Sequence, residues 1–89
     1  AFHQTVCAAW KSPAAEPGEL LPVHSDVPAL ILGGRYDPIT PPEWGRIVAE
    51  WLPNSMVIEF PHLAHASVSL DHCADRIAAT FLDRPDGNP

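Results

Sequence analysis

An aspartate and two histidines follow two apolar stretches of the sequence, at places where strands are expected to end. Asp37 comes shortly after the apolar run at 29–32, and His62 and His65 follow the run at 56–60. In open parallel α/β sheets, functional side chains collect in the loops beyond the carboxyl ends of the strands. A carboxylate can there orient an imidazole and stabilise its protonated form, so this spacing predicts acid–base chemistry by Asp37 and a histidine.

Asp37 and His65 also have plain structural explanations. Asp37 precedes Pro38, a pairing that is common where a chain reverses. Capping does not require Asp37, because Thr40 is expected to cap the helix that follows. The partner of Asp37 is therefore expected elsewhere in the fold. His65 has an alternative role as a loop histidine bonded to backbone groups.

A metal site is a second chemical alternative. It would use His62, His65 and His72, with Asp71 as a further ligand. Two ligands three residues apart face one metal ion when they lie on a helix. Pro61 and the loop composition argue against a helix at this point, so the metal site is the weaker hypothesis.

The elements that carry these residues follow from the apolar pattern. The run "ALIL" at 29–32 ends in two glycines and is typical of a strand covered on both faces. Thr40 is predicted as a helix N-cap, with Pro41 at the first helical position and Glu43 completing a capping box. The run "MVIEF" at 56–60 predicts a second strand. Strand, helix and strand make a βαβ unit, whose strands should run parallel with a right-handed crossover.

Two amphipathic helices are expected around this unit. The first has one apolar stripe that should pack on the sheet, and Pro53 ends it; the stripe consists of Trp44, Ile47, Val48, Trp51 and Leu52. The second has an apolar set formed by Leu70, Cys73, Ile77, Phe81 and Leu82. Two strands and two helices cannot cover both faces of their own sheet. The chain is therefore expected to be an incomplete part of a larger parallel α/β fold.

The N-terminal part has a different composition. The sequence "TVCAAWK" at 5–11 predicts a helical turn or two, with Thr5 as its cap. Four prolines and a glycine between 12 and 28 favour an extended connector. We therefore expect a short helix and connector at 1–26, an α/β segment at 27–82 and a polar tail at 83–89.

Size and charge narrow the possible functions. The 89 residues carry a net charge of −6 with only five Lys or Arg, which argues against nucleic acid or an anionic membrane as a partner. No apolar run approaches the roughly 20 residues of a membrane helix, and the start does not resemble a signal peptide. A chain this short buries little surface, so a reinforcing staple or a partner is expected.

Two cysteines, Cys7 and Cys73, stand far apart in the sequence. This spacing excludes CxxC redox chemistry and a cysteine-rich zinc site. It leaves two alternatives open, which are a disulfide and a pair of reduced thiols.

The stretch from 27 to 82 resembles the C-terminal part of the α/β-hydrolase fold. The phrases "GGRYDPITPPEW" and "CADRIAATFLD" carry the resemblance, together with "CAAW" upstream. The similarity is greatest to the TAP-like C-terminal region of secreted tripeptidyl aminopeptidases related to prolyl aminopeptidases. It implies a βαβα portion of that fold, a location outside the cell or in its envelope, a peptide or small ester or amide as substrate, and no cofactor.

The resemblance also assigns roles by position. Asp37 would be the acid of a Ser-His-Asp triad and His65 its general base, while Cys7 and Cys73 match the family's paired cysteines and imply a disulfide. None of the chain's serines lies in the GxSxG elbow that this fold uses for its nucleophile; they are at 12, 25, 55, 67 and 69. The nucleophile is thus expected outside this chain, which would act only with the rest of the hydrolase domain.

The histidine loop departs from the family's pattern. The family commonly has a form like GxGHG, whereas this chain reads "HLAHA" at 62–66. His62 occupies the place of an early glycine, so it is the weaker candidate for the base. Two alternatives to the peptidase remain, which are a catalytically inactive hydrolase-fold segment that binds ligands and an esterase or amidase of the same fold.

Overall fold

Two parallel strands form the centre of the structure. The computed structural model describes residues 2–86, and of Ser67 and Val68 it describes the backbone alone. The end of the predicted polar tail, 87–89, lies outside the described residues. The elements follow one another as α1 (Phe2–Trp10), η1 (Pro17–Leu20), β1 (Ala29–Gly34), α2 (Pro42–Trp51), β2 (Ser55–Phe60), η2 (Ser67–Leu70) and α3 (His72–Asp83).

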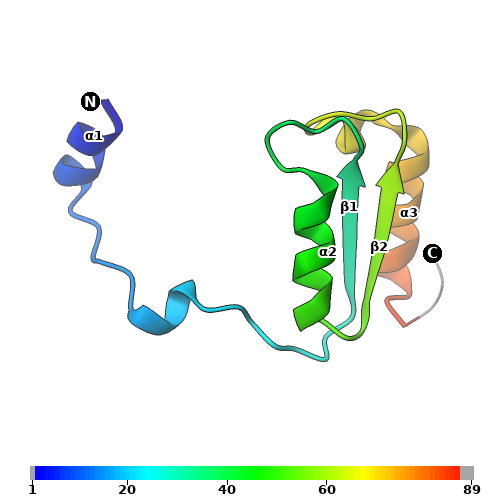
Figure 1. The fold of residues 1–89 in the computed structure, drawn as a ribbon, viewed down its shortest axis with the longest axis horizontal. Helices are drawn as coiled ribbons and strands as arrows, with labels where there is room; N and C mark the ends of the chain where they lie inside the picture. The colour runs from blue at the N-terminus through cyan, green and yellow to red at the C-terminus, as the bar shows by residue number, and fades with distance from the viewer. Residues whose placement is uncertain (1, 87–89) are drawn as a thin grey trace.

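The strand pairing brings both strand ends to the same edge. β1 and β2 pair in parallel from Ala29 beside Ser55 to Gly34 beside Phe60, as the βαβ pattern predicts. Each strand includes residues just outside the predicted apolar run, since β1 runs on through both glycines. The loops that follow Gly34 and Phe60 therefore leave the sheet side by side (Figure 1).

The two long helices of this part cover opposite faces of the sheet. Ile31 lies beneath Gly45 of α2, whereas the next residue, Leu32, lines a small cavity with Ala74 and Ala78 of α3. Successive residues of a strand point to opposite faces, so α2 and α3 must lie on different sides. The mixed helix and strand structure with a parallel sheet confirms the predicted α/β class and the expected order of strand, helix, strand and helix.

Much of the apolar stripe of α2 is left uncovered by the sheet, contrary to the sequence-based expectation. Trp44, Ile47 and Val48 are 57%, 54% and 48% exposed. The helix turns its smallest residue to the sheet instead, because a side chain at Gly45 would meet Ile31. The two-stranded sheet is too narrow to cover the stripe. The amphipathic pattern identified an apolar helix face correctly, but the sheet covers this face only in part.

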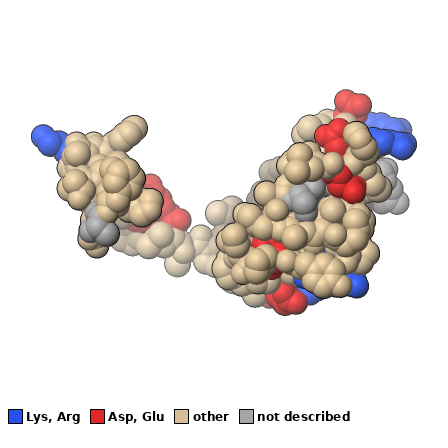
Figure 2. Space-filling model, turned by 90° about the horizontal axis from the view of Figure 1, so that it is seen from above, with Lys and Arg blue, Asp and Glu red and all other residues tan. Residues whose placement is uncertain are grey.

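α1 stands apart from the α/β part of the chain. It begins at Phe2, so Thr5 lies inside the helix and is not its cap. Figure 2 shows α1 and the sheet region as two bodies joined by a narrow connector. The connector is fixed to the α/β part near its end, where the ring of His24 packs edge-on against Trp51 at 4.5 Å between centroids.

The disulfide implied by the resemblance is not formed in the structure. Cys7 and Cys73 are both free and exposed. A disulfide needs Cα atoms within about 7 Å of each other. Cys7 lies on α1, which the extended connector carries away from α3 and Cys73 (Figure 1).

Within residues 2–86, none of the helices combines the length and the apolar character that crossing a bilayer requires.

Candidate active site

Asp37 lies in the turn that follows β1. Arg35 N–H donates to the carbonyl oxygen of Phe60 at 3.0 Å, which extends the strand pairing by one residue. Asp37 N–H then donates back to the carbonyl oxygen of Gly34 at 3.2 Å and closes the turn. The side chain of Asp37 is only 7% exposed. The turn therefore buries a carboxylate directly above the end of the strand.

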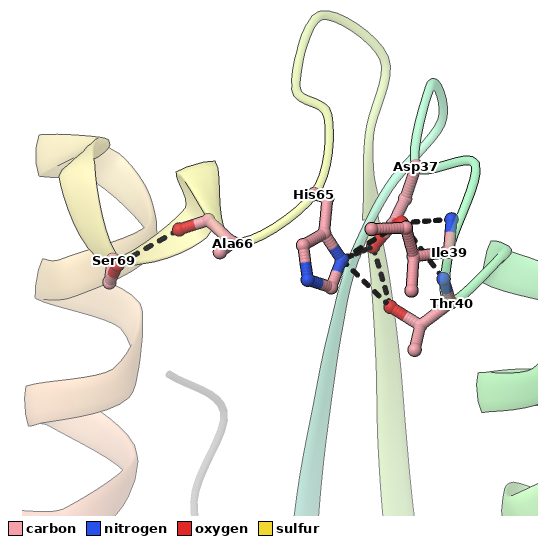
Figure 3. Close-up of polar contacts among 6 residues, drawn as sticks. All are labelled: Asp37, Ile39, Thr40, His65, Ala66 and Ser69. Carbon is pink, nitrogen blue, oxygen red and sulfur yellow. Dashed lines mark hydrogen bonds and ion pairs between the residues drawn. The ribbon is translucent and has the colours of Figure 1, made fainter. Parts of the chain in front are cut away.

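Both oxygens of the Asp37 carboxylate accept hydrogen bonds from the same short loop. Oδ1 accepts from the backbone N–H groups of Ile39 and Thr40, each at 2.9 Å, and Oδ2 accepts from the Thr40 hydroxyl at 2.6 Å (Figure 3). This is the bonding of an Asx turn extended by a threonine. Asp37 thus has partners within its own loop before any other part of the chain is considered.

Thr40 does not cap α2, so this expectation was wrong. The N-cap position belongs to Pro41, and no side chain caps the helix there. Glu43, which was predicted to complete a capping box, lies 3.6 Å from Arg46 in an ion pair. The reason is local: Asp37 takes up the hydroxyl and the N–H of Thr40, and the helix begins two residues later at Pro42.

His65 faces the carboxylate from the loop after β2. Its Nδ1 lies 3.0 Å from Oδ1 and 3.0 Å from Oδ2 of Asp37. An ionised carboxylate only accepts hydrogen bonds, so this network assigns the proton of a neutral ring to Nδ1. The second ring nitrogen, Nε2, is then a lone-pair acceptor, and it points away from Asp37 (Figure 3). The side chain is 43% exposed, which leaves this nitrogen accessible.

The surroundings of Asp37 keep it ionised. Burial by itself raises the pKa of this carboxyl group, because a charge loses hydration there. The hydrogen bonds from the Thr40 hydroxyl, from the N–H groups of Thr40 and Ile39, and from His65 outweigh burial and hold the pKa well below its ordinary value. Asp37 is therefore a permanent negative charge beside the imidazole at neutral pH.

A glycine allows the histidine loop to lie over the end of β1. A Cβ atom on Gly34 would stand 2.6 Å from the carbonyl oxygen of Leu63 and 2.8 Å from that of Ala64. The loop is held there by a hydrogen bond from Tyr36 N–H to the Leu63 carbonyl oxygen at 3.0 Å. No glycine of the described chain has a positive φ, so Gly34 is needed for space and not for its backbone conformation.

The residue after His65 keeps a glycine-like backbone. Ala66 has φ of 56°, in the left-handed region that L-residues rarely occupy. The family pattern commonly has glycine at this place, where this chain has alanine. Ala66 adopts this left-handed backbone although it carries a methyl group, and the resulting strain costs about 1–2 kcal/mol.

His62 lies in a different interaction. Its Nε2 is 3.3 Å from Oδ2 of Asp71, the residue that caps α3 by accepting from Ala74 N–H at 2.9 Å. That backbone bond, ahead of the contact with His62, lowers the pKa of Asp71. His62 is thus tied to the start of α3, while His65 faces Asp37. Within the described residues, no three His, Cys, Asp or Glu side chains gather as a metal site, so His62, His65 and His72 are not brought together.

A group of ion pairs supports the Asp37 turn from the outside. Glu59, near the end of β2, accepts from Arg35 Nε at 2.7 Å and also pairs with Arg46 of α2. The bond from Arg35 is the main reason why the pKa of Glu59 is lowered. The two arginine side chains are more than half exposed, and pairs formed by such exposed groups contribute little to stability. Their role is to link the residue two before Asp37 with both β2 and α2.

A cleft begins at the Asp37–His65 pair. It has a volume of about 420 Å³ and extends between α2 and the sheet. Asp37, Thr40 and His65 line one end of the cleft, while Ile31 and Val57 form part of its apolar wall.

On the other side of His65, the hydroxyl of Ser69 donates to the Ala66 carbonyl oxygen at 2.9 Å (Figure 3). This serine therefore has a structural partner in its own loop.

Three residues of the site were not singled out from the sequence as contributors. The sequence pattern predicts a helix cap at Thr40 and the end of a strand at Gly34, and it gives Ala66 no role. The signal for Thr40 was its distance of three residues from Asp37, which suits an Asx turn as well as a cap. Nothing in the sequence shows that a loop more than 25 residues later lies on Gly34.

Comparison with known proteins gives one match. The family model described as TAP-like protein matches residues 1–88. No curated protein and no solved structure matches the chain.

Proposed function

We propose that this chain, which belongs to the TAP-like protein family, supplies the acid and the base of a Ser-His-Asp triad in a secreted serine exopeptidase. Membership relates the chain to the α/β-hydrolases. The observation that carries the finer proposal is the position of His65 Nδ1, 3.0 Å from both oxygens of a buried, ionised Asp37. The nucleophilic serine would lie in the part of the hydrolase domain outside these residues.

In the proposed reaction, His65 transfers the protons and Asp37 supports its ring. Nε2 of His65 takes the proton from the serine hydroxyl as the oxygen attacks the carbonyl carbon of the substrate. Asp37 stabilises the imidazolium that forms and keeps its ring oriented. His65 then returns the proton to the leaving amine, which departs and leaves an acyl-enzyme. In the second half, His65 takes a proton from water, the hydroxyl attacks the acyl carbon, and the proton returns to serine.

The substrate class rests on the family resemblance. An aminopeptidase that releases residues or short peptides from free N-termini is the activity proposed, together with a location outside the cell or in its envelope. An esterase or amidase would use the same pair in the same way. Turnover of a tripeptidyl anilide, compared with that of a simple nitrophenyl ester, distinguishes the two, since a peptidase pocket should favour the anilide by kcat/KM.

The triad assignment is tested by substitution in the full-length protein. Asp37→Asn leaves the shape intact and should lower kcat by about 10⁴-fold, the loss that the equivalent change causes in serine proteases. His65→Ala should cause a similar loss. The double variant should be hardly worse than either single one, because triad members act as a unit.

His62→Ala is the matched control. His62 lies in the same loop, carries the same ring and pairs with a carboxylate, but its partner is Asp71. Its kcat should stay close to that of the wild type. The proposal fails if Asp37→Asn retains near-normal turnover or if His62→Ala is the inactivating change. Labelling by a fluorophosphonate probe should map to a serine in a GxSxG elbow and should be lost in His65→Ala.

A further inference from the structure

We propose that Thr40 is a positioning residue of this site, whose hydroxyl fixes the Asp37 carboxylate so that it can hold His65 in one tautomer. The inference rests on the proposed function, in which Asp37 and His65 are the acid and the base. The Thr40 hydroxyl is not needed to start α2, because this helix has no side-chain cap. The hydroxyl is therefore available for a role in the reaction.

The argument begins with the two oxygens of Asp37. Oδ1 is fixed to the chain by two backbone N–H groups, those of Ile39 and Thr40. The two oxygens turn together about Cβ–Cγ, a torsion that has broad minima in aspartate, so these two bonds restrain the carboxylate from one side. A bond to the second oxygen restrains the same torsion from the other side.

Oδ2 has two partners with very different roles. One is the Thr40 hydroxyl at 2.6 Å, a short charge-assisted bond from a residue of the same tight loop. The other is Nδ1 of His65 at 3.0 Å, which comes from a separate loop. Without Thr40, the remaining partner of Oδ2 would be the ring that Asp37 has to orient. The hydroxyl therefore provides the fixed point for the second oxygen.

The direction of the Thr40 hydroxyl matters as well. A hydroxyl has one proton and two lone pairs, and here the proton is committed to Oδ2. Its oxygen lies 3.4 Å from Nδ1 of His65 and faces it with a lone pair. Nδ1 is thus surrounded by three acceptor oxygens, which favour a proton on Nδ1 and oppose the tautomer protonated on Nε2. Nε2 stays available to take a proton.

The test compares two substitutions of Thr40 in the full-length protein. Thr40→Val keeps the branched shape and removes the hydroxyl, and we expect kcat to fall about tenfold to a hundredfold with KM unchanged, as for the loss of a bond to a charged group. Thr40→Ser keeps the hydroxyl and should restore kcat to near the wild-type value. Thr80→Val is the matched control, because the Thr80 hydroxyl donates to the Arg76 carbonyl oxygen on α3 and kcat should not change.

A spectroscopic measurement does not depend on turnover. In Thr40→Val the carboxyl carbon of Asp37 should titrate at higher pH than in the wild type, by ¹³C NMR, whereas Thr40→Ser should not move it. In the wild-type protein, imidazole ¹⁵N shifts should show neutral His65 protonated on Nδ1. If Thr40→Val does not fold, this wild-type spectrum decides, and a ring protonated on Nε2 overturns the inference.

The outcomes separate this inference from the function it rests on. If Asp37→Asn is inactive while Thr40→Val keeps its kcat, the role of Thr40 is refuted and the triad stands. A Thr40→Ser variant as impaired as Thr40→Val refutes it too, because the hydroxyl is then irrelevant. If Asp37→Asn and Thr40→Val are both fully active, the triad and the inference fail together.

Discussion

Gly34→Ala should displace the loop that carries His65. The new methyl group would stand 2.6 Å from the Leu63 carbonyl oxygen, where ordinary contact begins at 3.4 Å, so one side must move by about 0.8 Å. The atoms in the way belong to the backbone and cannot rotate aside. Gly34 itself is held in the strand pairing opposite Phe60, so the histidine loop is the part that yields.

Two consequences of that movement can be given a size. Forcing an extra carbon into a packed position costs typically about 1–3 kcal/mol of stability. A shift approaching 1 Å at a catalytic group costs roughly a hundredfold in rate, because the reacting atoms leave their productive geometry. The movement acts mainly on His65, because the bonds of Asp37 to Ile39 and Thr40 lie within its own loop. We therefore expect kcat to fall by between tenfold and a hundredfold, while those bonds keep the pKa of Asp37 below its ordinary value.

Gly33→Ala provides a matched control one residue earlier. A Cβ atom at Gly33 would lie 3.8 Å from Pro42, an ordinary contact, so this variant should fold and turn over substrate as the wild type does. Both variants would be assayed in the full-length protein for kcat, KM and thermal midpoint. Equal activity of the two would refute the claim that Gly34 sets the position of the histidine loop, as would a Gly33→Ala variant with the larger loss.

Two further predictions concern stability, measured by thermal or denaturant unfolding of the full-length protein. Ala66→Gly should raise the free energy of unfolding by about 0.5–1 kcal/mol, because relief of the left-handed strain exceeds the entropy cost of a glycine. Ala64→Gly is the control, and it should lower the free energy of unfolding because Ala64 has no positive φ. A loss of stability in Ala66→Gly would contradict the strain. The lowered pKa of Asp37 means that its stabilisation is complete above the unfolded pKa of about 4 and is lost as the pH falls below it. Asp37→Asn should therefore flatten the acid side of the stability curve, and an unchanged slope between the two proteins would count against the lowered pKa.

The sequence predicted the fold class because each central element has a strong local pattern. The apolar runs at 29–32 and 56–60 and the amphipathic stretch between them allow few arrangements other than a parallel βαβ unit. The structure extends the strands slightly and keeps their order and direction. Placement of Asp37 and His65 on neighbouring loops followed from that topology, and the structure brings the two side chains into contact.

The predictions that were wrong concern contacts between residues far apart in the sequence, or two partners that compete for the same hydrogen-bonding group. A capping rule assigns Thr40 to the helix because it considers only the residues that follow. The carboxylate three residues earlier is a stronger partner for the hydroxyl, and the structure gives it that bond. Periodicity likewise shows that α2 has an apolar face but not which surface covers it, and Trp44 remains more than half exposed. The disulfide was inferred from a resemblance, whereas the structure has Cys7 on a separate helix.

The register of the two strands explains how so small a segment can hold Asp37 and His65 in contact. Gly34 lies beside Phe60, and the bond from Arg35 N–H to the Phe60 carbonyl oxygen continues the pairing into the turn. A slip of one residue would shift one loop against the other by about 3.3 Å and turn each strand's side chains to the opposite face. The 3.0 Å contact between His65 and Asp37 could not survive that shift. The distance between Asp37 and His65 is thus set by strand pairing within the chain, while the exposed residues of the α2 stripe leave an apolar surface that the described part of the chain does not cover.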